Sequence, residues 1–323
     1  MSLAAVRALR DRYPEAEIVV LARAWVADLY LGEPAINRII PLAGQPGLKD
    51  IGAKWRQAQA LRREHFELAV LLPNSFESAA LVFAARIKRR VGYARDGRAW
   101  MLTDAIPRPA PGEIPRHERY YYPELLVRAG ILKQLPSIPE IHFAGIAEAQ
   151  ARGEKLLAER GLTGAVIGIS PGAAFGGAKR WLPERFAAAA RTIAAELNAK
   201  VAVFGSGAER AMCDEVAVAA AGVNLAGATS LREFIDMTAA CRFFLTNDSG
   251  AMHIAAALRV PSITVFGPTD ETATGPCSAT AHLLREPVEC APCKKRECPI
   301  DHRCMTRVSA DRVASEALQI LRH

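Results

Sequence analysis

No stretch of the chain carries the roughly 18 uninterrupted apolar residues of a membrane-spanning helix, so no spanning segment is expected. The N-terminal sequence MSLAAVRALRDRYPEAE lacks a charged start followed by an apolar core and a cleavage site, so no secretory signal is expected either. Short-period repeats and low-complexity tracts are also missing. Together these absences predict a cytoplasmic protein.

A disulfide framework is not expected either, because the chain has an odd count of seven cysteines and no secretory signal. Four of the cysteines form one cluster with the spacing Cys290-x2-Cys293-x4-Cys298-x5-Cys304. Thiolates at these separations can hold one tetrahedral zinc, with His302 as an alternative ligand. Such a zinc would be structural, because four protein ligands leave no open position. Reduced thiols in a loop and a redox pair are the alternatives that the spacing leaves open.

What the sequence does contain is typical of a globular protein with two domains. Half of its 323 residues are hydrophobic and 23% are charged. The net charge of +7 favours anionic partners such as phosphorylated sugars, anionic lipids or nucleic acid. The densest basic runs extend from Arg86 to Arg98 and from Lys294 to Arg296. Solvated surface is the plainest interpretation of both runs.

Strand and helix patterns alternate along the whole chain. Strands are expected at 17–22, 36–42, 68–72, 166–169, 200–204, 242–245 and 262–266, with a short one around Val91. Helices are expected at 1–12, 49–65, 117–132, 146–160, 182–197, 208–221, 230–241, 250–258 and 309–321. Strands separated by single helices form parallel sheets with right-handed crossovers. The pattern therefore predicts an α/β fold of two Rossmann-like domains, residues 1–160 and 161–323, facing a cleft. The last helix is expected to pack back on the first domain.

The segment 246–253, Thr-Asn-Asp-Ser-Gly-Ala-Met-His, follows a predicted strand and opens a helix. Gly250 would let a ligand approach the helix end, whose free N–H groups and dipole attract phosphate. Asp248 would either cap this helix or accept hydrogen bonds from sugar hydroxyls. His253 would contact the phosphate or sugar, unless it is an ordinary satisfied histidine.

A second loop, Ser-Pro-Gly-Ala-Ala-Phe-Gly-Gly-Ala-Lys-Arg-Trp at 170–181, has the same strand-then-helix context. Its glycines allow it to wrap an anion. Lys179 would place a positive charge at a diphosphate leaving group and stabilise the charge that develops there. The alternative is a plain turn with a solvated Lys-Arg pair. Trp181 is expected to pack in the core.

Two shorter motifs complete the candidate site. Glu209 in Phe-Gly-Ser-Gly-Ala-Glu would hold ribose hydroxyls or a base edge, or serve only as a surface carboxylate at a helix start. In the first domain, Asn74 or Ser75 would cap the next helix and also contact an acceptor.

The strings PNSFESA, PGAAFGGAKRW, FGSGAE, NLAGATSL, TNDSGAMHIAAAL and FGPT resemble those of the lipopolysaccharide heptosyltransferases of glycosyltransferase family 9, most of all the heptosyltransferase II subgroup. The resemblance covers essentially the whole chain. It implies a GT-B fold, an inverting mechanism and an ADP-heptose donor. It also implies a heptosyl-Kdo2-lipid A acceptor at the cytoplasmic face of the inner membrane. A monomer that needs no cofactor and no nucleic acid is expected.

The resemblance also assigns residues. Donor-binding roles fall on Lys179, Glu209, Thr229, Asp248, Ser249, Gly250 and His253. Thr229 would open the helix after NLAGA. Family members begin with a strand and a G-D-x-V-M-S loop that carries the proposed catalytic Asp, and Met1 matches the end of that loop. We therefore expect the first strand and the general base to lie upstream of this start.

Three alternatives remain at this stage. The first is a related transferase that uses another nucleotide sugar or adds the first heptose, and the second is a protein that binds an ADP-sugar without turnover. The third is a nucleic-acid protein, which the lack of interleaved aromatics near the cysteines disfavours.

Overall fold

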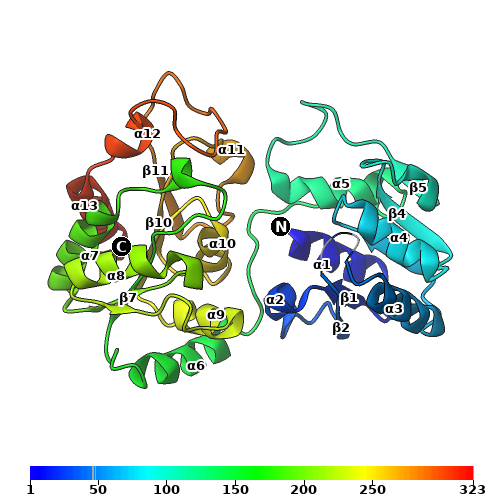
Figure 1. Ribbon diagram of the computed structural model, residues 1–323, viewed down its shortest axis with the longest axis horizontal. Helices are drawn as coiled ribbons and strands as arrows, with labels where there is room; N and C mark the ends of the chain where they lie inside the picture. Colours follow the sequence, from blue (N-terminus) through cyan, green and yellow to red (C-terminus); the bar gives the residue numbers. More distant parts are fainter. Residues whose placement is uncertain (46, 48, 323) are drawn as a thin grey trace. The chain divides into compact units, whose positions relative to one another are not determined.

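The computed structural model describes residues 1–45, 47 and 49–322. The chain divides into two compact units, Met1–Ile138 and Pro139–His323 (Figure 1). The sequence placed this boundary between residues 160 and 161. It falls earlier because α6 (Ile146–Ala158) packs along α9 (Leu231–Ala239) and so belongs to the second unit.

The first unit is an α/β layer structure with two separate parallel sheets. Its elements are α1 (Ser2–Arg12), β1 (Val19–Ala22), α2 (Ala24–Ala27), β2 (Arg38–Pro41), α3 (Ile51–Arg63), β3 (Leu68–Leu71), α4 (Phe76–Ala84), β4 (Arg89–Tyr93), β5 (Asp104–Ile106) and α5 (Tyr121–Arg128). Strands β1 and β2 form one sheet, and β3, β4 and β5 form the other. In the described residues no ladder joins the two sheets. Helices α3 and α4 pack in one apolar cluster, and α1 and α5 pack with β4 in another.

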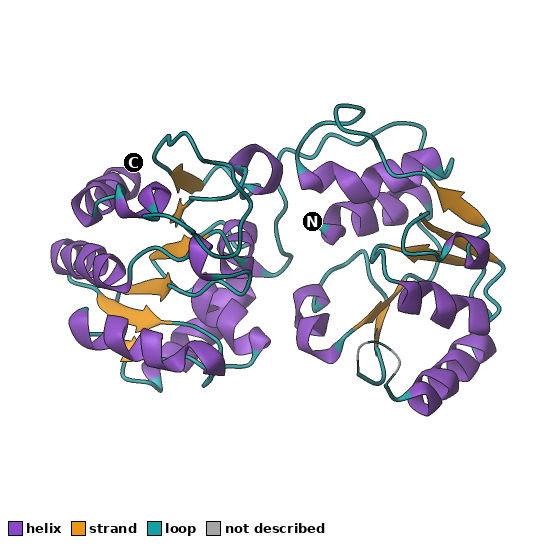
Figure 2. Ribbon diagram, turned by 45° about the horizontal axis from the view of Figure 1, so that its top comes forward, coloured by secondary structure: helices purple, strands orange, loops and turns teal. Residues whose placement is uncertain are grey.

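The second unit contains one six-stranded parallel sheet. Its remaining elements are β6 (Val166–Ser170), α7 (Pro183–Leu197), β7 (Lys200–Val203), α8 (Arg210–Ala219), β8 (Val223–Asn224), β9 (Phe243–Asn247), α10 (Gly250–Ala257), β10 (Ser262–Val265), α11 (Glu271–Thr274), β11 (Ala281–Leu284), α12 (Arg303–Thr306) and α13 (Ala310–Arg322). The strand order is β11-β10-β9-β6-β7-β8. Helices lie on both sides of these strands (Figure 2). The order reverses between β6 and β9, and at such a switch point the loops leave toward opposite faces and open a crevice.

The structure confirms the predicted α/β class with parallel strands, and it adds three strands. Strands β5, β8 and β11 were not predicted, because each is short or lacks a clear pattern of its own. The last helix, α13, lies against α7, and its buried residues Val313, Ala314 and Ala317 belong to the core of the second unit. No helix among residues 1–45, 47 and 49–322 is long and apolar enough to cross a bilayer.

The close contact between α6 and α9 depends on Gly153. A Cβ added to Gly153 would lie 1.9 Å from the backbone oxygen of Asp236. We expect Gly153→Ala to lower the free energy of unfolding by about 3 kcal/mol, because the helices must move apart to admit the methyl group. Thermal unfolding measures the effect.

The matched control is Gly52→Ala in α3, where the nearest atom to the added Cβ is an Arg56 nitrogen at 3.6 Å. This change should raise stability by roughly 0.5–1 kcal/mol, since alanine is the better helix former. Equal melting temperatures for the two variants would contradict the packing argument.

Candidate active site

The candidate site lies at the carboxyl ends of β6 and β9, where the strand order reverses. Asn247, the last residue of β9, is fully buried and joins the two loops that leave these strands. Its Oδ1 accepts a hydrogen bond from the Trp181 backbone N–H at 3.0 Å, and its Nδ2 donates to the Pro171 carbonyl at 2.7 Å. The two segments that the sequence singled out are therefore held together by one amide side chain. Trp181 itself is fully buried, as predicted.

Lys179 and Asp248 form a buried ion pair at this point. The Lys179 Nζ lies 2.6 Å from Asp248 Oδ2, and the two side chains are 14% and 6% exposed. Thr269, from the loop after β10, donates its hydroxyl to the same carboxylate oxygen at 2.5 Å. Asp248 therefore fixes the position of Lys179. The predicted alternative that Asp248 caps α10 is wrong, because Ser249 occupies the cap position and α10 has no side-chain cap.

The start of α10 is open on the side where a ligand would approach. A Cβ added to Gly250 would meet no described atom within 4 Å. Ser249 Oγ lies 3.3 Å from Thr246 Oγ1, so its hydroxyl faces the end of β9. His253 is half-buried one turn into the helix. The free N–H groups of this helix end can donate hydrogen bonds to an anion.

Glu209 follows β7, the strand next to β6, and its side chain lies against the 170–181 loop. Its Oε2 accepts hydrogen bonds from the N–H and hydroxyl of Ser206, at 2.9 and 2.7 Å, which completes a capping box. Its other oxygen faces Gly172, where an added Cβ would lie only 2.1 Å away. Glu209 thus lies beside the 170–181 loop and also has a structural role. Thr229 does not open the next helix: Ser230 caps α9 through its own capping box with Glu233.

The cysteine-bearing segment, residues 290–304, is hydrogen-bonded to the loop that carries Lys179. The sequence did not predict this contact. The Ala178 N–H donates to the Arg296 carbonyl at 2.9 Å, and the Ala178 carbonyl is 2.8 Å from His302 Nε2. Further along, the Lys294 N–H donates to the Pro268 carbonyl at 2.8 Å, in the loop that carries Thr269. Lys179 is therefore positioned by a segment more than a hundred residues away in the sequence.

The four clustered cysteines have different environments. Cys290 and Cys293 are exposed, Cys298 is half-buried and Cys304 is buried. Burial, reinforced by the other three thiols, raises the pKa of Cys304 to about 11. Within the described part of the chain, no three His, Cys, Asp or Glu side chains are grouped as metal ligands.

Comparison with known proteins gives the family. A model described as glycosyltransferase family 9 (heptosyltransferase) matches residues 54–303. The chain belongs to glycosyltransferase family 9. Lipopolysaccharide heptosyltransferase 2 of Salmonella typhimurium is 35% identical over 298 residues, which cover 88% of this chain and 84% of that protein.

Solved structures agree with this assignment. The structure of E. coli ADP-heptose LPS heptosyltransferase II matches with a TM-score of 0.82 at 29% identity, covering 99% of this chain and 94% of that one. E. coli heptosyltransferase WaaC with ADP matches with a TM-score of 0.72 at 17% identity, covering 99% and 95%, which shows the shared fold. The predicted family and fold class are confirmed, and the chain is a glycosyltransferase.

In the first unit of this family 9 glycosyltransferase, the loop after β3 is organised by a buried arginine. Ser75 caps α4 by accepting the Ser78 N–H at 3.3 Å, as predicted. Asn74 has both ends of its amide engaged: Nδ2 donates to the Tyr121 hydroxyl at 2.9 Å, and Oδ1 accepts from Arg98 at 3.3 Å. The guanidinium of Arg98 also donates to the carbonyls of Tyr93, Pro73 and Ser75 and to the Ser78 hydroxyl.

Arg98 ends a basic run that was interpreted as solvated surface, yet its side chain is fully buried. Burial lowers its pKa, because desolvation disfavours the charged form. Its acceptors are neutral oxygens, and no carboxylate pairs with it among the described residues. One side chain thereby fixes the conformation of the whole Asn74–Ser75 turn.

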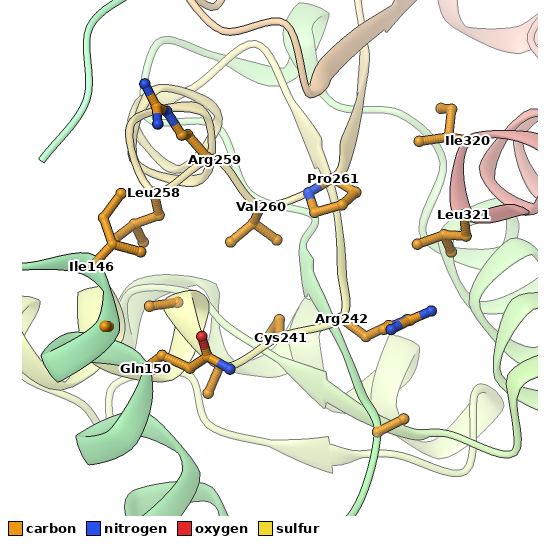
Figure 3. Close-up of a pocket in the computed structure, with 14 residues that line it drawn as sticks. Ile146, Gln150, Cys241, Arg242, Leu258, Arg259, Val260, Pro261, Ile320 and Leu321 are labelled. Carbon is orange, nitrogen blue, oxygen red and sulfur yellow. The ribbon is translucent and has the colours of Figure 1, made fainter. Parts of the chain in front are cut away.

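A hollow in the second unit lies at the amino ends of β9 and β10 (Figure 3). Its wall includes Arg242 and Pro261, which immediately precede β9 and β10, and Ile320 and Leu321 from α13. No carboxylate lines it in the part of the chain that the structure describes.

Asp248→Asn tests whether this carboxylate, besides holding Lys179, also contacts the sugar as the sequence predicts. We expect the affinity for ADP-heptose to fall about tenfold, because a charged acceptor for sugar hydroxyls is lost. The affinity for ADP should stay within about threefold, since Lys179 is released to meet phosphate. Calorimetric titration with both ligands measures this, and unchanged affinity for ADP-heptose would remove Asp248 from sugar recognition.

Proposed function

We propose that this protein transfers L-glycero-D-manno-heptose from ADP-heptose to the heptosyl-Kdo2-lipid A inner core of lipopolysaccharide, with inversion at the anomeric carbon. The observation that carries the proposal is the buried Lys179–Asp248 pair at the carboxyl ends of β6 and β9. It occurs in a chain that is 35% identical to a lipopolysaccharide heptosyltransferase 2. The family membership supports heptose transfer in inner-core synthesis.

In this proposal the second unit binds the donor. The ammonium group of Lys179 stabilises the negative charge on the departing ADP, and the N–H groups at Ser249 and Gly250 contact a phosphate. Asp248 and His253 orient the sugar. On the nucleoside side, ribose and base are held by the two remaining donor residues, Glu209 and Thr229.

The first unit binds the acceptor in this proposal. Asn74 and Ser75 lie on the loop after β3, held by Arg98, and would contact acceptor hydroxyls or phosphates. The acceptor is a membrane lipid, so the protein would work peripherally at the cytoplasmic face of the inner membrane. Its basic surplus of 41 Lys and Arg over 34 Asp and Glu suits such a surface. The residue that removes the acceptor proton is not assigned.

The test is ADP release from ADP-heptose with three acceptor conditions: heptosyl-Kdo2-lipid A, Kdo2-lipid A, and none. Release only with heptosyl-Kdo2-lipid A supports the proposal. Release with Kdo2-lipid A alone would reassign the protein to the first heptose addition. Tight ADP binding without release in any condition would identify a nucleotide-sugar binder without turnover.

A structural zinc at Cys290, Cys293, Cys298 and Cys304 stays a separate proposal. Metal analysis of protein purified without chelator tests it. About one zinc per chain would support it, and clearly substoichiometric zinc would favour reduced thiols.

A further inference from the structure

We propose that Arg296 is a donor-binding residue whose guanidinium, together with Lys179, binds the diphosphate of the nucleotide-sugar donor. This inference rests on the proposed function, because it assumes a donor that leaves as a nucleoside diphosphate. Arg296 lies in the cysteine-bearing segment, which the sequence connected only with metal or redox chemistry and whose basic run was interpreted as solvated surface.

The first observation is that two cations share one aromatic ring at the donor loop. The Lys179 Nζ lies 5.0 Å from the centre of the Phe175 ring, and the Arg296 Cζ lies 5.3 Å from it. Both distances are in the range of cation–π attraction. The Phe175 residue is 41% exposed, so this cluster lies at the surface where a ligand can reach it.

The second observation is that the backbone of Arg296 is fixed beside Lys179. The Arg296 carbonyl accepts the Ala178 N–H at 2.9 Å. At Gly176 an added Cβ would lie 2.3 Å from this carbonyl oxygen, so glycine is required for the approach, and its φ of +156° adds to that requirement. The neighbouring Glu297 accepts the Gly177 N–H at 2.9 Å. The backbone of Arg296 is thus hydrogen-bonded to Ala178, the residue before Lys179.

The third observation concerns charge. Lys179 is paired with Asp248, so these two groups together add no net charge for a diphosphate. The Arg296 guanidinium forms no ion pair with a carboxylate among residues 1–45, 47 and 49–322, and it lies over the Phe175 ring. A planar guanidinium can bind two phosphate oxygens at once, and stacking on a ring limits the freedom that it loses on binding. Arg296 therefore supplies the uncompensated positive charge that the leaving diphosphate requires.

The experiment compares ADP and adenosine binding by calorimetry to the wild-type chain, Arg296→Gln, Arg296→Lys and the control Lys295→Gln. The control removes the same charge from the adjacent residue, which is exposed as Arg296 is but does not share the Phe175 ring. We expect Arg296→Gln to weaken ADP binding about tenfold, or about 1.4 kcal/mol, and to leave adenosine binding unchanged. Arg296→Lys should weaken ADP binding about threefold, because an ammonium group keeps the charge but cannot bind two phosphate oxygens as a planar guanidinium does. Lys295→Gln should change ADP affinity less than about twofold, since a screened charge that is not held at the Phe175 ring adds only a weak general attraction.

Unchanged ADP affinity in Arg296→Gln would overturn the inference while leaving the proposed function in place. An equal loss for ADP and adenosine would also overturn it, because Arg296 would then act only by shaping the loop. A wild-type chain that fails to bind ADP would instead refute the proposed donor.

Discussion

Lys179→Ala should lower the turnover number by roughly 100- to 1000-fold, with ADP-heptose and heptosyl-Kdo2-lipid A at saturation. The proposed function places the departing diphosphate, on which negative charge develops, beside the Lys179 ammonium group at the ends of β6 and β9. Steady-state ADP release measures the change. Turnover within about threefold of the wild type would remove Lys179 from the leaving-group site.

This substitution also affects stability, because it leaves Asp248 buried without its cation. Breaking a buried pair costs about 3 kcal/mol. The double variant Lys179→Met with Asp248→Asn removes both charges and should recover most of that stability. It should not recover turnover. If the double variant were as active as the wild type, the ion pair would be only a structural element.

Arg98→Met should destabilise the first unit by about 3 kcal/mol or more. The substitution leaves the carbonyls of Pro73 and Ser75 in the loop after β3, and that of Tyr93 at the end of β4, without their donor in a buried region. Urea unfolding followed by tryptophan fluorescence measures it. Three of the four tryptophans, Trp25, Trp55 and Trp100, belong to the first unit.

The matched control is Arg95→Met. Arg95 is 49% exposed and pairs with the adjacent Asp96, so its loss should change stability by less than about 0.5 kcal/mol. Arg98→Lys should fall between the two, because one ammonium group cannot reach all the acceptors. If Arg98→Met unfolded at the same urea concentration as Arg95→Met, water would replace the lost hydrogen bonds and the prediction would be wrong.

Local pattern was sufficient for most of the fold. Each predicted strand and helix has its counterpart within a few residues, because apolar periodicity and the glycines and prolines at element ends act over short stretches. The rule that ligands bind beyond parallel strands then directed attention to Lys179 and Asp248 before their contact was visible. The same approach placed the unit boundary too late and gave Asp248 a capping role that the structure does not show.

The supporting residues were harder to predict, because their roles arise from contacts across long sequence separations. Asn247 belongs to the same strand end as Asp248, yet its part in joining two loops depends on Pro171 and Trp181 lying beside it. Thr269 and His302 carry no motif that points to Lys179. Arg98 looked like surface charge, since a run of basic residues does not reveal which member is buried.

The sequence by itself determined the family, the two parallel-sheet units and the positions of the loops that follow β6 and β9, because those follow from local patterning and from glycine-rich turns at strand ends. Only the tertiary structure decided that Lys179 is held by Asp248, that the cysteine-bearing segment braces its loop, and that Arg296 shares a ring with it. The physical reason is that these contacts join segments brought together by sheet order and packing. Such proximity is a property of the folded chain and leaves no periodic trace in the residues that make the contact.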